Sequence, residues 1–558
     1  MSESKMSKLE MQRKLFSELS AMFGREVPLY DRSLAINFLC NRAVCDLLSD
    51  RFALFSIRDE MLERTSGERH GAIRIGRPDE YRLITRFFGC FAMEPHGFYD
   101  MTTVGSKSQP IIATAFRSTQ APEHRVFTSL LVTDYFDEQT KARIEAALST
   151  RRVFTDLAVS LIDKSEQNGG LSQADADLLI SEATDRIFKW TGHASHYGLY
   201  KELCDGGFKI AADIACFERH HLNHLTPNTL CIDLYVAAMK FCLGGIDADT
   251  FIRCALVALD RLIAAAGPDW IALHFKHLSA ADSKAICDGP VNAVSSESTV
   301  DLLIQKLLPL QDQIRKIPHA GFKEFTEGPG PDTPILLRQD AYKALTEPVI
   351  FHEPDGTTIA SGHTARFGEI EQRFYATTPS GRAIYDECLE KIEKIRSSKP
   401  SVSTKESLFE DASIKVFAVF PNLLGGLLKK SFVYACYSPT PLGIARVGTI
   451  DTCDFVCLYE QGLIERVGQR YEDFLPVSAA GIFASNLNQY GTMRTAAKQP
   501  KYCQGQLEEI MGRSIVDIDS VYARIDCQSR LRCIHQLGIT HLVDSDELER
   551  LTRLSALD

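Results

Sequence analysis

The chain has 558 residues, is 45% hydrophobic and 24% charged, and carries a formal net charge of −11. This length allows roughly three or four domains of about 150 residues each. The acidic balance excludes a basic nucleic-acid footprint, so an anionic ligand must be held by local positive charge. No apolar run approaches the roughly 20 residues of a membrane helix, and no signal peptide is recognised. We therefore expect a cytoplasmic protein that binds neither nucleic acid nor membranes.

Sixteen cysteines are scattered among apolar residues, and no two of them form a Cys-x-x-Cys pair. Cys453 and Cys457 come closest to that spacing. Buried cysteine packs as a small hydrophobe, so these residues are predicted to be reduced core side chains.

The first 235 residues alternate predicted helices and strands. A Ser-x-x-Glu capping box at Ser7 begins a helix that Gly24 is predicted to end. Further helices are predicted at 79–88, 141–162 and 172–190, and strands at 68–76, 113–117 and 125–132. Residues 210–217 are predicted to be a strand or a buried segment.

The strand at 68–76 places His70, Ala72 and Arg74 on one face. At about 3.3 Å per residue, His70 and Arg74 lie about 13 Å apart along that face. A metal at His70 could therefore hold one end of a short dicarboxylate while Arg74 reaches the other. A single strand histidine is, however, more often structural than metal-bound.

His220, His221 and His224 fall within five residues, just before a Thr-Pro turn. Such a cluster is a candidate metal site, because neutral imidazole is the commonest metal ligand. If the segment were helical, His220 and His224 would share a face.

Residues 236–333 are predicted to be a helical insertion. One helix is predicted at 249–267, and Ser298 is predicted to cap another with an apolar face. The segment lacks a ligand-rich cluster, and His274 and His277 form its best pair. A structural or partner-binding role is therefore favoured over a chemical one.

The sheet pattern resumes at 334–339 and continues in 362–373. Alternation from Phe367 onward puts Glu369, Glu371 and Arg373 on one face. This face is either exposed with a salt bridge, or buried with a cation or partner charges, because buried carboxylates are costly alone. After a predicted helix to about residue 396 and a polar linker at 397–407, the rest is mixed and then helical.

We divide the chain into 1–235 and 334–490 as two parts of one catalytic domain, with a helical segment at 491–558.

His70, His224 and Glu369 provide two imidazoles and one carboxylate, the ligand set of facial-triad non-haem iron sites. Three positions then stay open, two for a 2-oxo acid and one for dioxygen. Spacing alone is weak evidence, because a chain with 15 histidines offers many such triples.

Five strings resemble the 2-oxoadipate dioxygenase/decarboxylase family, also called 2-hydroxyglutarate synthase. They are ERHGAIRIG, NHLTPNTLCID, PILLRQ, SGHTARFGEIEQR and YEDFLPVSAAGIF. The resemblance covers residues from about 10 to 235 and from about 334 to 535, and the 236–333 segment departs from it.

The resemblance implies an α+β fold whose curved sheet is related to the vicinal-oxygen-chelate fold and is surrounded by helices. It implies Fe(II) held by His70, His224 and Glu369. It further implies that Arg74 is a catalytic residue that holds the substrate, and that Val477 and Ser478 contact it. The implied reaction converts 2-oxoadipate and O2 into 2-hydroxyglutarate and CO2, a step of lysine catabolism. Four further residues could contact the substrate or the metal ligands, and a structural hydrogen-bonding role is an equal alternative for each. They are His363, Gln372, Arg373 and Arg338.

Two alternatives stay open at this stage. One is a lyase or isomerase of the same fold that uses Zn²⁺, Mn²⁺ or Mg²⁺ on another 2-oxo acid, because imidazole also suits zinc. The other is a non-catalytic relative that binds a partner through its inserted helices. The sequence does not determine the oligomeric state.

Overall fold

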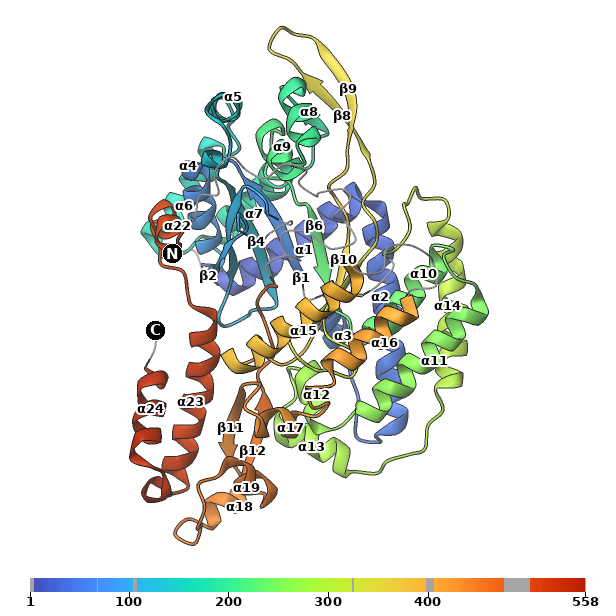
Figure 1. Ribbon diagram of the computed structural model, residues 1–558, viewed down its shortest axis with the longest axis vertical. Helices are drawn as coiled ribbons and strands as arrows, with labels where there is room; N and C mark the ends of the chain where they lie inside the picture. The colour runs from blue at the N-terminus through green and yellow to red at the C-terminus, as the bar shows by residue number, and fades with distance from the viewer. Residues whose placement is uncertain are drawn as a thin grey trace.

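The computed structural model describes residues 5–67, 69–103, 108–323, 326–397, 406–475 and 502–556. It is a mixed α+β structure in which small sheets are surrounded by helices (Figure 1). The predicted mixture of helices and strands is confirmed.

The largest sheet has five strands in the order β2-β3-β4-β1-β6. The strands are β1 (Arg69–Ile75), β2 (Glu94–Asp100), β3 (Ile111–Arg117), β4 (His124–Leu131) and β6 (His224–Pro227). Strand β1 runs parallel to β4 and antiparallel to β6. Helices α1 (Lys8–Glu26) and α4 (Pro78–Gly89) pack against this sheet. Strands β1, β3 and β4 are buried along nearly their whole length.

Strand β10 (Glu369–Arg373) pairs antiparallel with β7 (Leu337–Ala341) and lies beside the β6 edge of the large sheet. An isolated bridge joins Asn228 to Glu371, and the Thr229 amide donates to the Glu371 carbonyl at 2.8 Å. All five residues of β10 are buried. The prediction of a strand here is confirmed, and the reading of an exposed face with a salt bridge is wrong.

Two smaller sheets lie at opposite ends of the molecule. Strands β5 (His193–Ala194), β8 (Glu347–His352) and β9 (Thr358–His363) form one, and the β8–β9 hairpin projects at the top of Figure 1. Strands β11 (Ala435–Pro439) and β12 (Ile464–Gly468) form the other, at the bottom.

Helices form most of the remaining structure. The N-terminal half contributes α2 (Pro28–Arg51), α3 (Asp59–Ser66), α5 (Glu138–Ser149), α6 (Asp156–Asn168), α7 (Gln173–Glu182), α8 (Tyr197–Asp205) and α9 (Lys209–Cys216). The region of the predicted insertion contains α10 (Ile232–Cys242), α11 (Ala248–Ala265), α12 (Pro268–His274), α13 (Ala280–Asp288) and α14 (Ser296–Ile314). The C-terminal part contributes α15 (Pro379–Ser397), α16 (Glu406–Phe417), α17 (Leu424–Lys429), α18 (Pro441–Ala445), α19 (Phe455–Glu460), α22 (Gln504–Met511), α23 (Ile518–Gln536) and α24 (Ser545–Ser555).

The helices of the predicted insertion share the main hydrophobic core. Phe251 and Leu259 of α11 and Leu303 of α14 belong to the same buried cluster as the large sheet. Helix α14 also packs against α2. The domain boundaries themselves stay a prediction.

Four predicted elements differ in detail from the structure. Helix α1 continues past Gly24, and α14 is capped by Ser295, whose side chain accepts from the Glu297 amide, so the prediction of a Ser298 cap is wrong. The predicted helix at 141–162 is two helices, because Thr155 caps α6 by accepting from the Ala158 amide. The strand option for 210–217 is also wrong. The segment is helix α9, buried on all sides, so its apolar run carries no periodicity, while its alanines favour helix.

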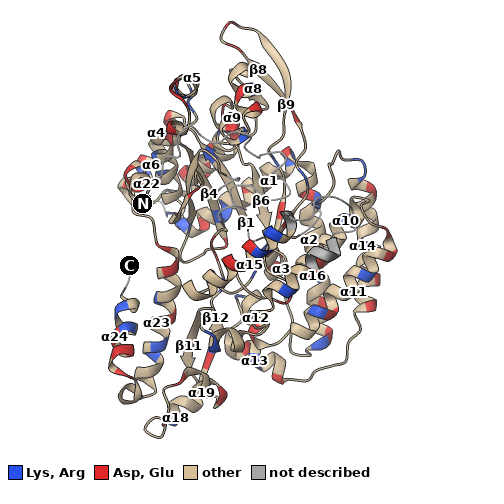
Figure 2. Cartoon of the chain, in the orientation of Figure 1, with Lys and Arg blue, Asp and Glu red and all other residues tan. Residues whose placement is uncertain are grey.

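Charges of both signs are distributed over the described helices (Figure 2). Within the described ranges, no helix is long and apolar enough to cross a bilayer. None of the sixteen cysteines forms a disulfide and nine are buried, which confirms the prediction of reduced side chains and, for those nine, of core positions.

Candidate metal centre

Strand register brings His70 and His224 together. In the β1–β6 pairing, His70 lies opposite Thr226 and Ala72 lies opposite His224. Residues that face each other across a ladder share a face, and alternate residues of a strand do so as well. Both imidazoles therefore project from the same side of the sheet. Their ring centroids are 5.5 Å apart, and both side chains are buried.

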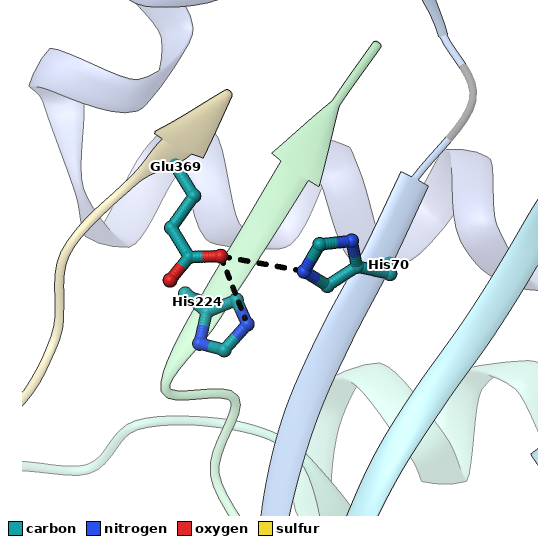
Figure 3. Close-up of side chains that lie close together, drawn as sticks. All are labelled: His70, His224 and Glu369. Carbon is teal, nitrogen blue, oxygen red and sulfur yellow. Dashed lines mark hydrogen bonds and ion pairs between the residues drawn. The ribbon is translucent and has the colours of Figure 1, made fainter. Parts of the chain in front are cut away.

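Glu369 of β10 adds a carboxylate to the two imidazoles. Its Oε2 lies 3.3 Å from His70 Nε2 and 3.7 Å from His224 Nε2 (Figure 3). One ligand atom from each of the three residues lies within 4.8 Å of the other two. Among the described residues this is the one cluster of His, Cys, Asp and Glu that meets this spacing.

Three of the atoms in this cluster that could bind a metal lack hydrogen bonds. Neither ring nitrogen of His224 nor Oε1 of Glu369 has a hydrogen-bond partner, although all are buried. A buried polar atom without a partner costs about 1–3 kcal/mol. Thr226 Oγ1 donates to Glu369 Oε2 at 3.0 Å, which leaves the rest of the carboxylate available. A metal ion between the three side chains would take one ring nitrogen of His224 and an oxygen of Glu369, so the residues fit such a group.

Electrostatics favour the protonation states that a metal requires at His224 and Glu369. Burial is the main reason that the pKa of His224 is lowered to about 4, so its imidazole is neutral at pH 7. Burial raises the pKa of Glu369, but His224 and His70 outweigh that effect, so its pKa lies below the ordinary value. A neutral imidazole and an ionised carboxylate are the forms that bind metal.

Glu371 supports the cluster from the same face of β10. Its Oε2 lies 3.0 Å from His70 Nδ1. Arg373 donates to both of its oxygens, at 2.6 and 2.8 Å, and Arg125 Nη2 donates at 3.2 Å. Burial opposes ionisation, but Arg373 and His70 hold the pKa of Glu371 well below its usual range. A carboxylate at Nδ1 favours the His70 tautomer that presents an unprotonated Nε2 to a metal.

The same arginines anchor the segment that precedes residue 476. Arg373 Nη1 donates to the carbonyls of Tyr471 and Asp473 at 3.0 and 2.8 Å. Arg125 Nη1 donates to the Glu472 carboxylate at 2.6 Å. Phe474, in this segment, contacts His70 edge to face, with ring centroids 4.9 Å apart. Val477 and Ser478, the predicted substrate contacts, lie outside the described residues.

Arg74 is buried on the same sheet face as the two histidines. Its Nη1 donates to Oδ2 of Asp213, on α9, at 2.5 Å. Asn223 Nδ2 donates to the same oxygen at 3.4 Å. Oδ1 of Asp213 lies 3.2 Å from His221 Nε2 and 3.3 Å from His363 Nε2. The position of the Arg74 guanidinium is therefore set by a buried carboxylate.

The other residues selected from the sequence contact groups outside the candidate metal centre. His220 Nε2 lies 3.9 Å from Glu80 Oε2, so of the three clustered histidines only His224 joins the candidate metal centre. His274 stacks on Trp270, and Gln372 Nε2 donates to the Leu230 carbonyl.

Of the residues proposed from the sequence to support the site, Arg338 has a structural role, whereas Arg373 and His363 contact residues beside the candidate metal centre. Arg338 forms two hydrogen bonds of 2.9 Å with Asp233, so it secures α10. Arg373 holds Glu371, and His363 contacts Asp213.

Asp213 and Thr226 were not selected from the sequence. Asp213 was hidden within the apolar run 210–217. The register of Thr226 opposite His70 becomes visible only once β1 and β6 are paired.

The fold and the cluster define a class of protein, an α+β chain with a buried His-His-carboxylate candidate metal centre. The family model described as 2-oxoadipate dioxygenase/decarboxylase matches residues 15–252 and 292–486. The chain therefore belongs to the 2-oxoadipate dioxygenase/decarboxylase family, which confirms the predicted resemblance.

Individual relatives match over nearly their whole length. The 2-oxoadipate dioxygenase/decarboxylase of Pseudomonas putida is 31% identical over 531 residues, which cover 93% of this chain and 95% of that protein. The Escherichia coli protein of that name is 29% identical over 530 residues, covering 93% and 97%. The crystal structure of hydroxyglutarate synthase in complex with 2-oxoadipate from Pseudomonas putida superposes with a TM-score of 0.66 at 28% identity. That match covers 96% of this chain and 99% of the other.

Proposed function

We propose that this protein is an Fe(II)-dependent dioxygenase/decarboxylase that converts 2-oxoadipate and O2 into 2-hydroxyglutarate and CO2 in lysine catabolism. The observation that carries the proposal is the buried cluster of His70, His224 and Glu369 in a member of this family. The relatives' names and the 2-oxoadipate complex of the Pseudomonas putida protein support the substrate.

His70, His224 and Glu369 would hold the metal through Nε2 of each imidazole and a carboxylate oxygen. When bound, Fe(II) supplies a site for chelating the 2-oxo acid and for activating O2. The Glu371 carboxylate, 3.0 Å from Nδ1 of His70, favours a proton on Nδ1 and so an unprotonated Nε2. Thr226 orients the Glu369 carboxylate by donating to Oε2. Burial of all three ligands excludes water from the reacting end of the substrate.

Arg74 would bind the distal carboxylate of the substrate. Asp213 takes one hydrogen bond from Nη1, and the guanidinium has five N–H donors in a fixed fork. The remaining donors can hold a second carboxylate, and a charge-assisted pair of this kind is among the stronger hydrogen bonds in proteins. The strand separation of His70 and Arg74 then selects chain length, because a shorter dicarboxylate cannot reach both ends.

Three finer assignments belong to the same proposal. The large sheet and the β10–β7 pair form a cup related to the vicinal-oxygen-chelate fold, with the ligands on its inner face. Val477 and Ser478 contact the substrate, as the family resemblance implies. The protein acts in the cytoplasm, which agrees with the absence of disulfides among its cysteines.

Oxygen consumption tests the proposal directly. Protein freed of metal and reloaded with Fe(II) is expected to consume one O2 and release one CO2 for each 2-oxoadipate, with 2-hydroxyglutarate as product. Protein loaded with Zn²⁺ is expected to be inactive. 2-Oxoglutarate, one methylene shorter, serves as the chain-length control and is expected to react more slowly.

Turnover without O2, or turnover supported equally by Zn²⁺, would contradict the proposal and favour a lyase or isomerase. Absence of any reaction, together with absence of stoichiometric metal binding, would favour a non-catalytic relative.

A further inference from the structure

The buried carboxylate of Asp213 lies between Arg74 and a histidine, His363. Arg74 Nη1 donates to Oδ2 of Asp213, and His363 Nε2 lies 3.3 Å from Oδ1. In the part of the chain that the structure describes, His363 Nε2 has no hydrogen bond to another group, although it is buried. A buried polar atom without a partner is costly, so this carboxylate is the partner of the imidazole.

The chemistry of the two groups gives this contact a direction. Burial raises the pKa of Asp213, but His221 and Arg74 outweigh burial and hold it well below its ordinary value. An ionised carboxylate only accepts, so the contact requires a proton on Nε2 of His363. Nδ1 of the same ring lies 3.0 Å from the hydroxyl of Tyr200, and this second contact orients the imidazole.

Aromatic packing also fixes the imidazole of His363. Its ring centroid lies 4.5 Å from that of Phe217 and 5.9 Å from that of Trp190, which is stacked on it. Trp190 contacts His221 edge to face, with 4.7 Å between the centroids. His221 Nε2 in turn lies 3.2 Å from Oδ1 of Asp213. One indole therefore holds both of the histidines that lie beside this carboxylate.

These contacts join four elements that are distant in sequence. Tyr200 belongs to α8, His363 ends β9, Asp213 belongs to α9 and Arg74 to β1. Helices α8 and α9 pack together beside the β8–β9 hairpin (Figure 1). Tyr200 and His363 also line a hollow of about 240 Å³, together with the exposed Lys201. The series of contacts therefore runs from this hollow to the sheet face that carries the candidate metal centre.

The orientation of the Asp213 carboxylate determines where Arg74 directs its remaining donors. The guanidinium is a rigid planar fork, so fixing one of its nitrogens on a carboxylate oxygen fixes the direction of the others. A carboxylate held through one oxygen rotates easily, because its terminal torsion is broad. Arg74 and Asn223 hold Oδ2, whereas His363 and His221 lie at Oδ1. Contacts at both oxygens restrict that rotation.

We propose that His363 is a positioning residue for Arg74 in binding the distal carboxylate of the substrate, and that Tyr200 orients His363. His363 fixes the carboxylate of Asp213, and that carboxylate fixes the guanidinium. The imidazole itself does not touch the substrate. This inference rests on the proposed function and assigns a determinant of its preference for a dicarboxylate.

Ligand binding without turnover tests this assignment. The dissociation constants of two ligands are measured by calorimetry on the Mn²⁺-loaded full chain without O2. 2-Oxoadipate has the distal carboxylate, and 2-oxohexanoate has a methyl group in its place. His363→Leu removes the donor, whereas His363→Gln puts an amide N–H close to the position of Nε2. His352→Leu, at an exposed histidine of β8, is the control for loss of a histidine.

His363→Leu is expected to weaken 2-oxoadipate by about 3- to 10-fold, which corresponds to one hydrogen bond. Its affinity for 2-oxohexanoate is expected to change less than about twofold, because that ligand has no carboxylate for Arg74 to hold. His363→Gln is expected to stay within about twofold of the parent protein for both ligands, since it keeps the donor. His352→Leu is expected to match the parent protein.

A second background tests whether His363 acts through Arg74. Residues that act through one another give losses that do not add. In the Arg74→Gln background, His363→Leu is therefore expected to cause less than about twofold further loss of 2-oxoadipate affinity. Tyr200→Phe removes only the hydroxyl and is expected to cause a smaller loss, again confined to 2-oxoadipate. If His363→Leu does not fold, this preferential loss is required of Tyr200→Phe.

Four results would overturn the inference. One is unchanged affinity for 2-oxoadipate in both His363→Leu and Tyr200→Phe. Another is an equal loss for both ligands, which a general structural defect would cause. The others are a loss in His363→Gln as large as in His363→Leu, and additive losses in the Arg74→Gln background. Failure of the parent protein to bind 2-oxoadipate, or to prefer it to 2-oxohexanoate, would instead contradict the proposed function.

Discussion

Glu369 and Glu371 lie two residues apart on the same face of β10, yet their surroundings are opposite. Glu371 accepts hydrogen bonds from Arg373 and Arg125 and contacts His70 Nδ1, so both of its oxygens are in use. Glu369 accepts a hydrogen bond from Thr226 and contacts His70 Nε2 at 3.3 Å, both at Oε2, and its Oε1 has no partner. One carboxylate is saturated by the protein, and the other is left with free coordinating capacity.

The difference separates the proposed metal ligand, Glu369, from its support, Glu371. A saturated carboxylate stays in place and fixes the imidazole beside it, whereas an unsaturated buried carboxylate is stable only with a further cation. The two carboxylates of β10 should therefore respond differently to the same substitution.

The largest expected effect is the loss of metal from Glu369→Gln. The amide keeps the size of the side chain and removes the charged ligand. Metal affinity and activity should fall well beyond the roughly 10- to 100-fold that follows loss of an outer hydrogen-bond partner. Calorimetric titration of metal into the metal-free protein measures this. Stability of the metal-free protein should change little, and affinity within tenfold of the parent protein would remove Glu369 from the ligand set.

Glu371→Gln is expected to affect stability more than metal binding. It leaves Arg373 buried without a full counter-charge and removes one of the two acidic partners of Arg125, which should lower the free energy of unfolding by about 3–5 kcal/mol. Metal affinity should fall by only roughly 10- to 100-fold. Urea unfolding and metal titration measure the two quantities on the same protein. If Glu371→Gln loses metal as completely as Glu369→Gln does, the distinction between ligand and support is contradicted.

Asp213→Asn sharpens the comparison at the substrate end. The amide keeps a hydrogen-bond acceptor for Arg74 but loses the charge that fixes the guanidinium. KM for 2-oxoadipate should rise by about tenfold, since roughly 1.4 kcal/mol of binding corresponds to that factor. Metal affinity should be unchanged. Steady-state kinetics with metal titration as the control measure this, and a metal defect without a KM effect would contradict the assigned role.

A further expected effect is a change in acid sensitivity in His96→Gln. Burial lowers the pKa of His96 to about 4, whereas the unfolded imidazole titrates near its ordinary value of 6.5. Between these values the unfolded chain binds a proton that the folded chain does not, so stability falls as pH decreases from about 6.5 to 4. One such group contributes about 1.4 kcal/mol per pH unit. The Gln variant should therefore show a flatter pH dependence of the unfolding free energy, and an identical slope would contradict this.

The sequence predicted the candidate site better than it predicted the helices around it. The alternation from Phe367 to Arg373 placed Glu369 and Glu371 on one face, and the family motifs selected His70 and His224. Sequence alone could not decide whether that face is buried, because burial depends on the β6 edge and on Arg125 from β4. It also missed Asp213, because an apolar run that is buried on all sides has no periodicity to distinguish helix from strand.

The most direct test of the central claim is anomalous diffraction at the iron edge from crystals of the Fe(II)-loaded protein, grown without O2. The account predicts one strong peak within bonding distance of His70 Nε2, His224 Nε2 and a carboxylate oxygen of Glu369, and no peak at Glu371. A peak bound elsewhere, or a loaded crystal in which any of these three side chains stays unligated, would contradict it.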